Sequence, residues 1–278
     1  YCIYSHGEDL LVDGGLYEGA GGFTVINYHH QSIAHNCITV KDPEQTKGWH
    51  FYDWTLETYE NSGGQNRPWR ETYPDAVLDG VPKDPSWPQY DGEVLHDMAD
   101  VTRRNHNDRY TYAFADLTNA YANPRWETDY EANRLADVDY RPKVSNVTRH
   151  WFYLRPRAGD DDEYFVAFDR VNAVEASFQK KSMLHFIGEP DFTNGSLESA
   201  EVSGHIETWS ADRFEMELGG AVLHGAAVLP AGAKLRKVGG TGYEYWANGV
   251  NYDPWPDTAN ELGGQRRRAI LPPPSQRD

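Results

Sequence analysis

Short segments that favour β-strands recur at regular spacing through the second half of this 278-residue chain. Turn-forming residues separate each segment from the next. The segments are His205–Trp209, Arg213–Leu218, Ala221–Leu229 and Lys234–Val238. Evenly spaced short strands are typical of two antiparallel sheets packed face to face. The chain is therefore predicted to be all-β, with the architecture of an antiparallel β-sandwich.

The first half and the middle of the chain contain further strand patterns. Tyr110, Tyr112 and Phe114 alternate with other residues, which indicates a strand with one buried face. A short helix is expected within Asp116–Arg134. The other predicted strands are residues 1–13 (two pieces split by the turn cluster Ser5–Asp9), Cys37–Val40, Val147–Leu154, Glu163–Val171 and Ser182–Ile187.

The long segment from Asp42 to Asp100 has no helical or strand periodicity and is rich in proline. Irregular segments of this length are uncommon inside a domain and often carry function. Its tryptophans could stack on sugar rings or cover the hydrophobic core, and the sequence favours neither. If they are exposed, we expect them to mark the face of a missing domain. They are Trp49, Trp54, Trp69 and Trp87.

The formal net charge of −17 limits the partners that the chain can bind. Nucleic acid is not expected, because phosphate binding needs a basic face. No membrane span is expected either, since no apolar run approaches the required ~20 residues. An acidic sugar polymer would need basic residues gathered locally. The candidate clusters, each of which could equally be a solvated surface, are Arg103 to Arg109, Arg149 with His150, and Lys180 with Lys181.

A histidine-rich stretch precedes the strand at Cys37–Val40, and another apolar run ends at Asp13. If the two strands pair, Asp13 and His35 can face each other. Aspartate and histidine are both zinc ligands, but a complete site needs three or four. In the alternative reading, His35 is a core histidine bonded to the backbone and Asp13 is a turn residue. The spacing alone favours this second reading.

Several blocks of the sequence resemble one family. NYHHQSIAHNCITVKDPEQ, preceded by LLVDGGLYEG, is similar to the heparinase II/III-like polysaccharide lyases. The resemblance continues, in order, through DRYTYAFADLTNAY, RHWFYLRP, EYFVAFDRV, KKSMLHFIGEP and KVGGTGYEYWANGVNYDP. It implies a β-sandwich domain over residues 1–258. The arginine- and proline-rich end of the chain indicates a ragged tail over 259–278, although members of the family usually continue into another strand near this point. The resemblance also implies an N-terminal α/α toroid in the parent protein, which this chain does not include.

The resemblance implies β-elimination on an acidic, uronic-acid-containing polysaccharide by a secreted or periplasmic parent protein. Asp13 matches the aspartate of the family's LxxDxG segment and His35 the histidine of its AHN segment, which implies Zn²⁺ at this pair. The third ligand would be a histidine upstream of Tyr1, and His6 is the residue of this chain that could replace it. The chain starts without an initiator methionine, so we expect a fragment or a processed product. Which glycan is cleaved stays open.

The remaining candidate residues come from the same comparison and from the basic clusters. Tyr28 and His29 are the candidate catalytic residues, because they would face the cleft beside the toroid; they could equally pack within their own loop. His30, Arg103 and Arg149 are candidate substrate-binding residues. Base, acid and carboxylate neutralisation must act together, so the chain alone is expected to be inactive. The alternative function is a non-catalytic carbohydrate-binding or structural β-sandwich module.

Overall fold

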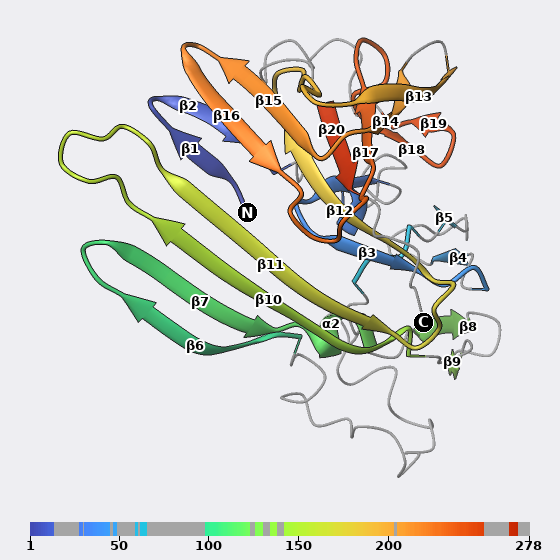
Figure 1. The fold of residues 1–278 in the computed structure, drawn as a ribbon. Helices are drawn as coiled ribbons and strands as arrows, with labels where there is room; N and C mark the ends of the chain where they lie inside the picture. Colours follow the sequence, from blue (N-terminus) through green and yellow to red (C-terminus); the bar gives the residue numbers. More distant parts are fainter. Residues whose placement is uncertain are drawn as a thin grey trace. The chain divides into compact units, whose positions relative to one another are not determined.

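The structure is a computed structural model (Figure 1). It describes residues 1–13, 28–29, 31–44, 47–48, 59–60, 62–65, 98–122, 126–129, 134–137, 142–202, 205–252 and 267–271. The chain forms two compact units, of which the first combines Tyr1–Gly64 with Gln179–Asp278 and the second is Gln65–Phe178. The second unit is therefore inserted, in sequence, between the two parts of the first.

The all-β prediction is confirmed, since the sheets are antiparallel and helix is scarce in the described residues. Those residues contain one short α-helix, α2 (Thr118–Ala122), and one 3-10 turn, η2 (Ser32–Ala34). The helix lies inside the range where the sequence predicts one. The same residues hold no helix with the length and apolar character needed to span a membrane. The packing of sheets into a sandwich stays a prediction.

A six-stranded sheet forms the main part of the first unit. Its strands, in spatial order, are β13 (Ser196–Glu201), β14 (Ile206–Ser210), β17 (Leu235–Gly239), β20 (Arg267–Leu271), β12 (Gln179–Phe186) and β3 (Ile38–Lys41). All neighbouring pairs are antiparallel. The prediction of a ragged tail over 259–278 is wrong at β20, because this strand lies inside the sheet and pairs with both β12 and β17. Its arginine and proline neighbours in sequence conceal the short apolar run that makes a strand.

Hairpins accompany this sheet. They are β1 (Ile3–Ser5) with β2 (Glu8–Leu11), β15 (Arg213–Leu218) with β16 (Ala221–Ala226), β18 (Trp246–Ala247) with β19 (Val250–Asn251), and β4 (Lys47–Gly48) with β5 (Tyr59–Glu60). Gly219 and Gly220 turn β15 into β16 with φ of 58° and 104°. Positive φ at both turn residues suits the right-handed twist of a hairpin, and only glycine adopts it without strain.

Strand β12 brings together the two segments that carry the predicted metal ligands. Its first half pairs with β3 from Gln179 to Ser182. Beyond that point, the Met183 N–H donates to the Cys37 carbonyl at 2.8 Å, and the Val12 N–H donates to the His185 carbonyl at 3.0 Å. The residues after β2 therefore continue the edge of β12 where β3 leaves it.

The core of the first unit lies between these elements. Phe186 of β12 and Phe214 of β15 meet edge to face, with ring centroids 5.3 Å apart. Leu10, Leu11 and Leu235 are buried in the same cluster. Burying such side chains stabilises the fold by roughly 1.5–3 kcal/mol each. This core fixes the end of β2, and with it Asp13, relative to β12.

The second unit contains a four-stranded antiparallel sheet. Its strands, in spatial order, are β11 (Tyr164–Ala173), β10 (Val144–Leu154), β7 (Tyr110–Asp116) and β6 (Asp100–His106). A hairpin of β8 (Trp126–Asp129) and β9 (Arg134–Asp137) belongs to the same unit. Helix α2 follows β7, where the Asp116 carboxylate accepts hydrogen bonds from the N–H (2.9 Å) and hydroxyl (2.6 Å) of Thr118.

Most of the predicted irregular segment, including its four tryptophans, lies outside the described residues, as does the predicted domain boundary at residue 258. The other predicted strands are confirmed to within a few residues.

Candidate functional site

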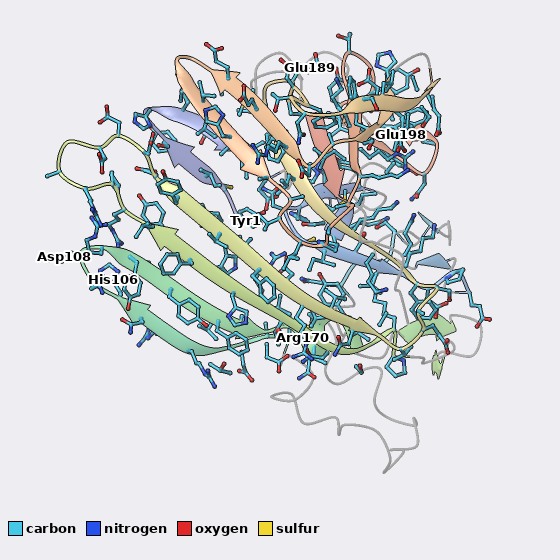
Figure 2. All side chains as sticks on the ribbon, viewed as in Figure 1. Tyr1, His106, Asp108, Arg170, Glu189 and Glu198 are labelled. Atoms are coloured by element: carbon cyan, nitrogen blue, oxygen red, sulfur yellow. The ribbon has the colours of Figure 1, made fainter. Side chains whose placement is uncertain are left out.

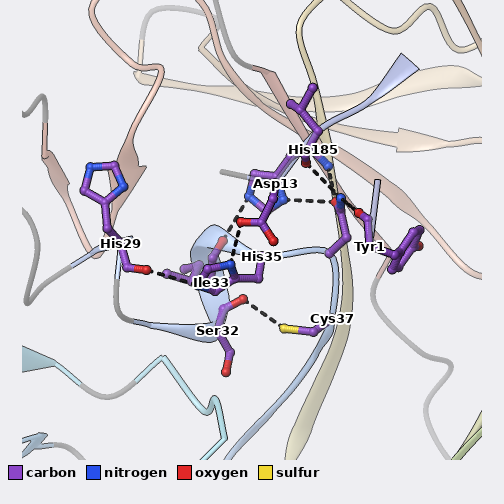
Figure 3. Close-up of polar contacts among 10 residues, drawn as sticks. Tyr1, Asp13, His29, Ser32, Ile33, His35, Cys37 and His185 are labelled. Atoms are coloured by element: carbon purple, nitrogen blue, oxygen red, sulfur yellow. Dashed lines mark hydrogen bonds and ion pairs between the residues drawn. The ribbon is translucent and has the colours of Figure 1, made fainter. Parts of the chain in front are cut away.

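Asp13 and His35 lie in contact, an arrangement that the sequence allows if two strands pair. The Nδ1 atom of His35 lies 2.7 Å from Oδ1 of Asp13, and both side chains are partly exposed, at 37% and 40% (Figure 3). The predicted reason is wrong, however, because β2 and β3 do not pair with each other. Asp13 follows β2 and His35 follows η2, and the two segments converge on the end of β12.

Asn36 holds the two segments together. Its side-chain amide donates to the carbonyl oxygens of Tyr1 (2.6 Å) and Val12 (2.8 Å). Its side-chain oxygen accepts the backbone N–H of His185 at 2.7 Å. The residue is 2% exposed, so these bonds replace water. Asn36 thus joins the chain before β3, the chain after β2 and strand β12 at one point, directly beside His35.

His185 completes this buried network. Its ring nitrogens lie 3.2 Å from Oδ1 of Asn36 and 3.0 Å from the carbonyl oxygen of Ile33. The side chain is 1% exposed. Because the ring is buried and bonded to the fold through both nitrogens, the role of His185 is structural. Next to it, the Cys37 thiol donates to the Ser32 carbonyl at 3.0 Å, which closes the turn that carries His35.

Both ring nitrogens of His35 face acceptors. Nδ1 faces the Asp13 carboxylate, and Nε2 lies 3.0 Å from the carbonyl oxygen of His29. A doubly protonated ring satisfies both acceptors, whereas a neutral ring satisfies one. A metal ion bound by His35 would take the place of one of these hydrogen bonds, because coordination needs a nitrogen lone pair.

The donor set at this position fits part of a zinc site. A carboxylate oxygen and an imidazole nitrogen are both ordinary zinc ligands, and they are already adjacent. Within the described part of the chain, no third His, Cys, Asp or Glu joins them in one cluster. His6, the candidate for the third ligand, lies in the β1–β2 turn, where its Nδ1 contacts the Ser5 hydroxyl at 2.8 Å. The described residues therefore supply two ligands of the required three or four.

The candidate catalytic residues Tyr28 and His29 are buried. Their side chains are 1% and 3% exposed. Both rings pack against Tyr245, with centroids 5.6 and 5.5 Å away, in a cluster that includes Tyr252. The expectation that they face solvent is therefore wrong. Edge-to-face packing of aromatic rings stabilises this arrangement, and it keeps both side chains away from a polymeric substrate. His30 lies outside the described residues.

The two candidate arginines belong to the second unit and do not meet. Arg149 forms a bidentate ion pair with Asp169, at 2.6 Å (Nε–Oδ1) and 2.9 Å (Nη2–Oδ2), and is 7% exposed. Its guanidinium also lies over the Trp151 ring, 5.2 Å from the centroid. A buried, neutralised guanidinium is a structural group, so this geometry gives no support to a substrate contact through Arg149.

Arg103 has a different environment. It is exposed on the edge strand β6, with its guanidinium carbon 5.8 Å from the ring centroid of Phe114. It lies opposite Phe114 of β7, whereas Arg149 lies opposite Ala115. Neighbouring residues of a strand point to opposite faces of the sheet, so the two arginines do not form one cluster.

No family model and no curated protein sequence matches the chain.

Proposed function

We propose that the chain is the β-sandwich portion of a polysaccharide lyase that cleaves uronic-acid-containing acidic glycans by β-elimination. The observation that carries the proposal is the 2.7 Å contact between Asp13 and His35. These are the two residues that the family resemblance marks as zinc ligands. They lie 22 positions apart in the sequence, and the side chain of Asn36 holds their segments together.

The proposal includes Zn²⁺ at this pair, with any further ligand contributed from outside the described residues. Bound zinc would link the segment after β2 to the segment before β3. Asn36 already orients both segments, so little rearrangement of the backbone is needed. His35 would exchange one of its hydrogen bonds for the metal. The hydrogen bond that His35 keeps would then orient its ring, and such a bond to a metal ligand raises metal affinity.

The elimination itself needs a base for the sugar C5 proton, an acid for the departing oxygen and a group that neutralises the carboxylate. Because Tyr28 and His29 are buried, we assign these roles to the α/α toroid expected in the parent protein. The parent is proposed to be secreted or periplasmic and to act on an acidic polysaccharide. The chain alone is expected to have no lyase activity.

The burial of Tyr28 and His29 also favours a second candidate function. A non-catalytic module that binds carbohydrate or supports assembly needs no accessible acid or base. In that case the Asp13–His35 pair is structural, with or without a metal. The two candidates differ in one measurable property, which is whether unsaturated uronide forms when the parent protein meets an acidic glycan.

The metal assignment is tested on the chain itself by elemental analysis after purification without chelator. Wild type is expected to hold zinc, and His35→Ala to lose it. His224→Ala is the matched control, because His224 is 70% exposed and its one partner among the described residues is Glu215 on the neighbouring strand. Equal zinc in wild type and His35→Ala would refute the assignment. Ultraviolet absorbance of the unsaturated product, measured with the parent protein, then separates the lyase from the binding module.

A further inference from the structure

One face of the sheet in the second unit carries aromatic side chains in rows that cross the strands. Phe114 of β7 lies opposite His150 of β10, which lies opposite Phe168 of β11. The ring centroids are 4.5 and 5.7 Å apart. Further along the sheet, Tyr110 stacks on Phe152 at 5.3 Å. We call this surface the aromatic face; its rings are Tyr110, Tyr112, Phe114, His150, Phe152 and Phe168.

The aromatic face is accessible along β11. Phe168 is 46% exposed, and Val166 and Tyr164, which share its face by alternation, are 51% and 58% exposed. The rings of β7 and β10 are half-buried. Side chains of this size are normally buried in a core, and contiguous exposed ones mark binding surfaces. Figure 2 shows the side chains of this sheet, with Arg170 labelled on β11.

Polar donors are set among the rings. Nδ1 of His150 lies 2.9 Å from the hydroxyl of Tyr112, and its Nε2 has no hydrogen-bond partner in the described part of the chain. Arg103 stands at the end of the row, beside the Phe114 ring, with no carboxylate partner among the described residues. In a chain with 43 acidic and 26 basic residues, a guanidinium without an acidic partner is available to an external anion.

The opposite face of the same sheet differs. There the cation Arg149 is buried and neutralised by Asp169. On the opposite face the corresponding rows are interrupted by Ala113, Ala167 and Thr111. The aromatic face instead sets neighbouring rings in one row with a histidine nitrogen and an arginine that have no partner among the described residues. A purely apolar partner would leave these polar groups unsatisfied on burial, which is costly.

We propose that the aromatic face binds a short stretch of an acidic, uronate-containing oligosaccharide. The apolar C–H groups on one side of each sugar ring would pack on Phe114 and Phe168. The sugar carboxylate would accept hydrogen bonds from Arg103 and from Nε2 of His150. The row crosses four strands, a span of about 14 Å at the usual strand spacing. This site is independent of the Asp13–His35 pair, and it would remain if the chain belonged to a protein without lyase activity.

The sheet provides matched controls for each half of the proposal. Phe165 lies on the same strand as Phe168 and is 39% exposed, but it points to the opposite face, where it contacts Trp151. Arg104 follows Arg103 and is also exposed, but it lies opposite Ala113 and so points away from the aromatic face. The test pairs are therefore Phe168→Ala with Phe165→Ala, and Arg103→Gln with Arg104→Gln.

The experiment is calorimetric titration of the full chain with three tetrasaccharides. Two are acidic, tetragalacturonate and a heparin-derived tetrasaccharide, and cellotetraose is the neutral reference. At least one acidic probe is expected to bind wild type more tightly than cellotetraose does. Phe168→Ala should weaken that binding about tenfold, the size expected for one lost stacking ring. Arg103→Gln should weaken acidic probes and leave cellotetraose unchanged, while both control variants should bind as wild type does.

Three results would overturn the proposal. One is the absence of binding by wild type to either acidic probe. Another is equal weakening by the test and control variants, which would indicate a general loss of structure. The last is a concentration-dependent dimer of wild type in sedimentation that Phe168→Ala abolishes, which would assign the aromatic face to a second copy of the chain. None of these outcomes depends on zinc or on lyase activity.

Discussion

Asn36 illustrates how a single side chain can determine the position of a candidate metal site. Replacing it with alanine removes its hydrogen bonds to the partly buried carbonyl oxygens of Tyr1 and Val12 and to the buried backbone N–H of His185. Each unsatisfied buried group costs roughly 1–3 kcal/mol. We therefore expect Asn36→Ala to lower the free energy of unfolding by about 3 kcal/mol in urea denaturation.

The control for this prediction is Asn172→Ala, because that residue is exposed on β11. Its free energy of unfolding should stay within about 0.5 kcal/mol of wild type. If Asn36→Ala were as stable as Asn172→Ala, the role assigned to Asn36 would be wrong. Zinc content should also fall in Asn36→Ala, because the segments that carry Asp13 and His35 would no longer be held together.

The sequence identifies Asp13 and His35 as a pair that could meet, but it does not indicate how they are brought together. Apolar runs that end on polar residues indicate where strands deliver side chains, and this pattern identifies both residues. The partners of Asn36 are backbone groups far along the chain, which no residue pattern reveals. The burial of Tyr28 and His29 is equally hidden, because it depends on Tyr245 of a distant hairpin.

At the scale of elements, the Arg149–Asp169 pair ties β10 to β11. Removing one partner of a buried ion pair leaves an uncompensated charge and costs about 3–5 kcal/mol. Arg149→Ala should therefore destabilise the protein by that amount. The double variant Arg149→Met with Asp169→Leu should recover most of the loss, because it removes both charges. Urea unfolding measures both variants, and an unchanged stability in Arg149→Ala would show that this arginine is free for another role.

Lys237 of β17 stabilises the other unit in a pH-dependent way. Burial lowers the pKa of its amine, but hydrogen bonds to Glu207 of β14 and to Glu189, together with their charges, outweigh burial and raise the pKa above its ordinary 10.5. Both contacts are 2.9 Å. A raised pKa means that the stabilising charge is fully present below pH 10.5 and is lost as the pH rises through the folded-state pKa.

The measurement is thermal unfolding between pH 9 and 12, compared with Lys237→Arg, whose charge persists throughout. Wild type should lose stability relative to the arginine variant only above pH 10.5. A constant difference across this range would show that the charge of Lys237 contributes nothing.

Strands with alternating or apolar residues are predictable from the sequence, and the exposed ones are not. Strand β6 was missed because its sequence, DVTRRNH, is polar and exposed throughout at a sheet edge. Strand β13, SLESAE, is likewise exposed along its whole length. The period-two signal needs one buried face, and these strands have none. In β20 the signal was present but short, between arginines and prolines.

At the scale of the whole molecule, the net charge of −17 opposes any acidic ligand at long range. Salt screens this repulsion, with a Debye length of about 8 Å at physiological ionic strength. The association rate of an acidic tetrasaccharide with the full chain should therefore rise between about 20 and 150 mM salt. Stopped-flow fluorescence measures it, with cellotetraose as the salt-insensitive reference. A rate that falls with salt would mean that the local cations, Arg103 above all, dominate the approach.

The sequence does not predict the division into two units: the first junction lies in the turn-forming run at residues 61–65, but no linker-like composition marks the second, at Phe178–Gln179. The prediction of one sandwich over residues 1–258 places both units in a single domain, because strands in both units show the same alternation of apolar and polar residues. Only long-range pairing separates them, and the pairing partner of β3 lies beyond the whole second unit.

That pairing has a consequence for how the protein is made. Strand β3 ends at Lys41, but its partner β12 begins at Gln179. At roughly 5–20 residues per second, a ribosome needs on the order of ten seconds to cover this distance. During that time β3 leaves the ribosome without its neighbour, and the intervening unit can fold first and bring the two ends closer. The centre of the six-stranded sheet stays open longer still, until Arg267–Leu271 arrive to fill the space between β17 and β12.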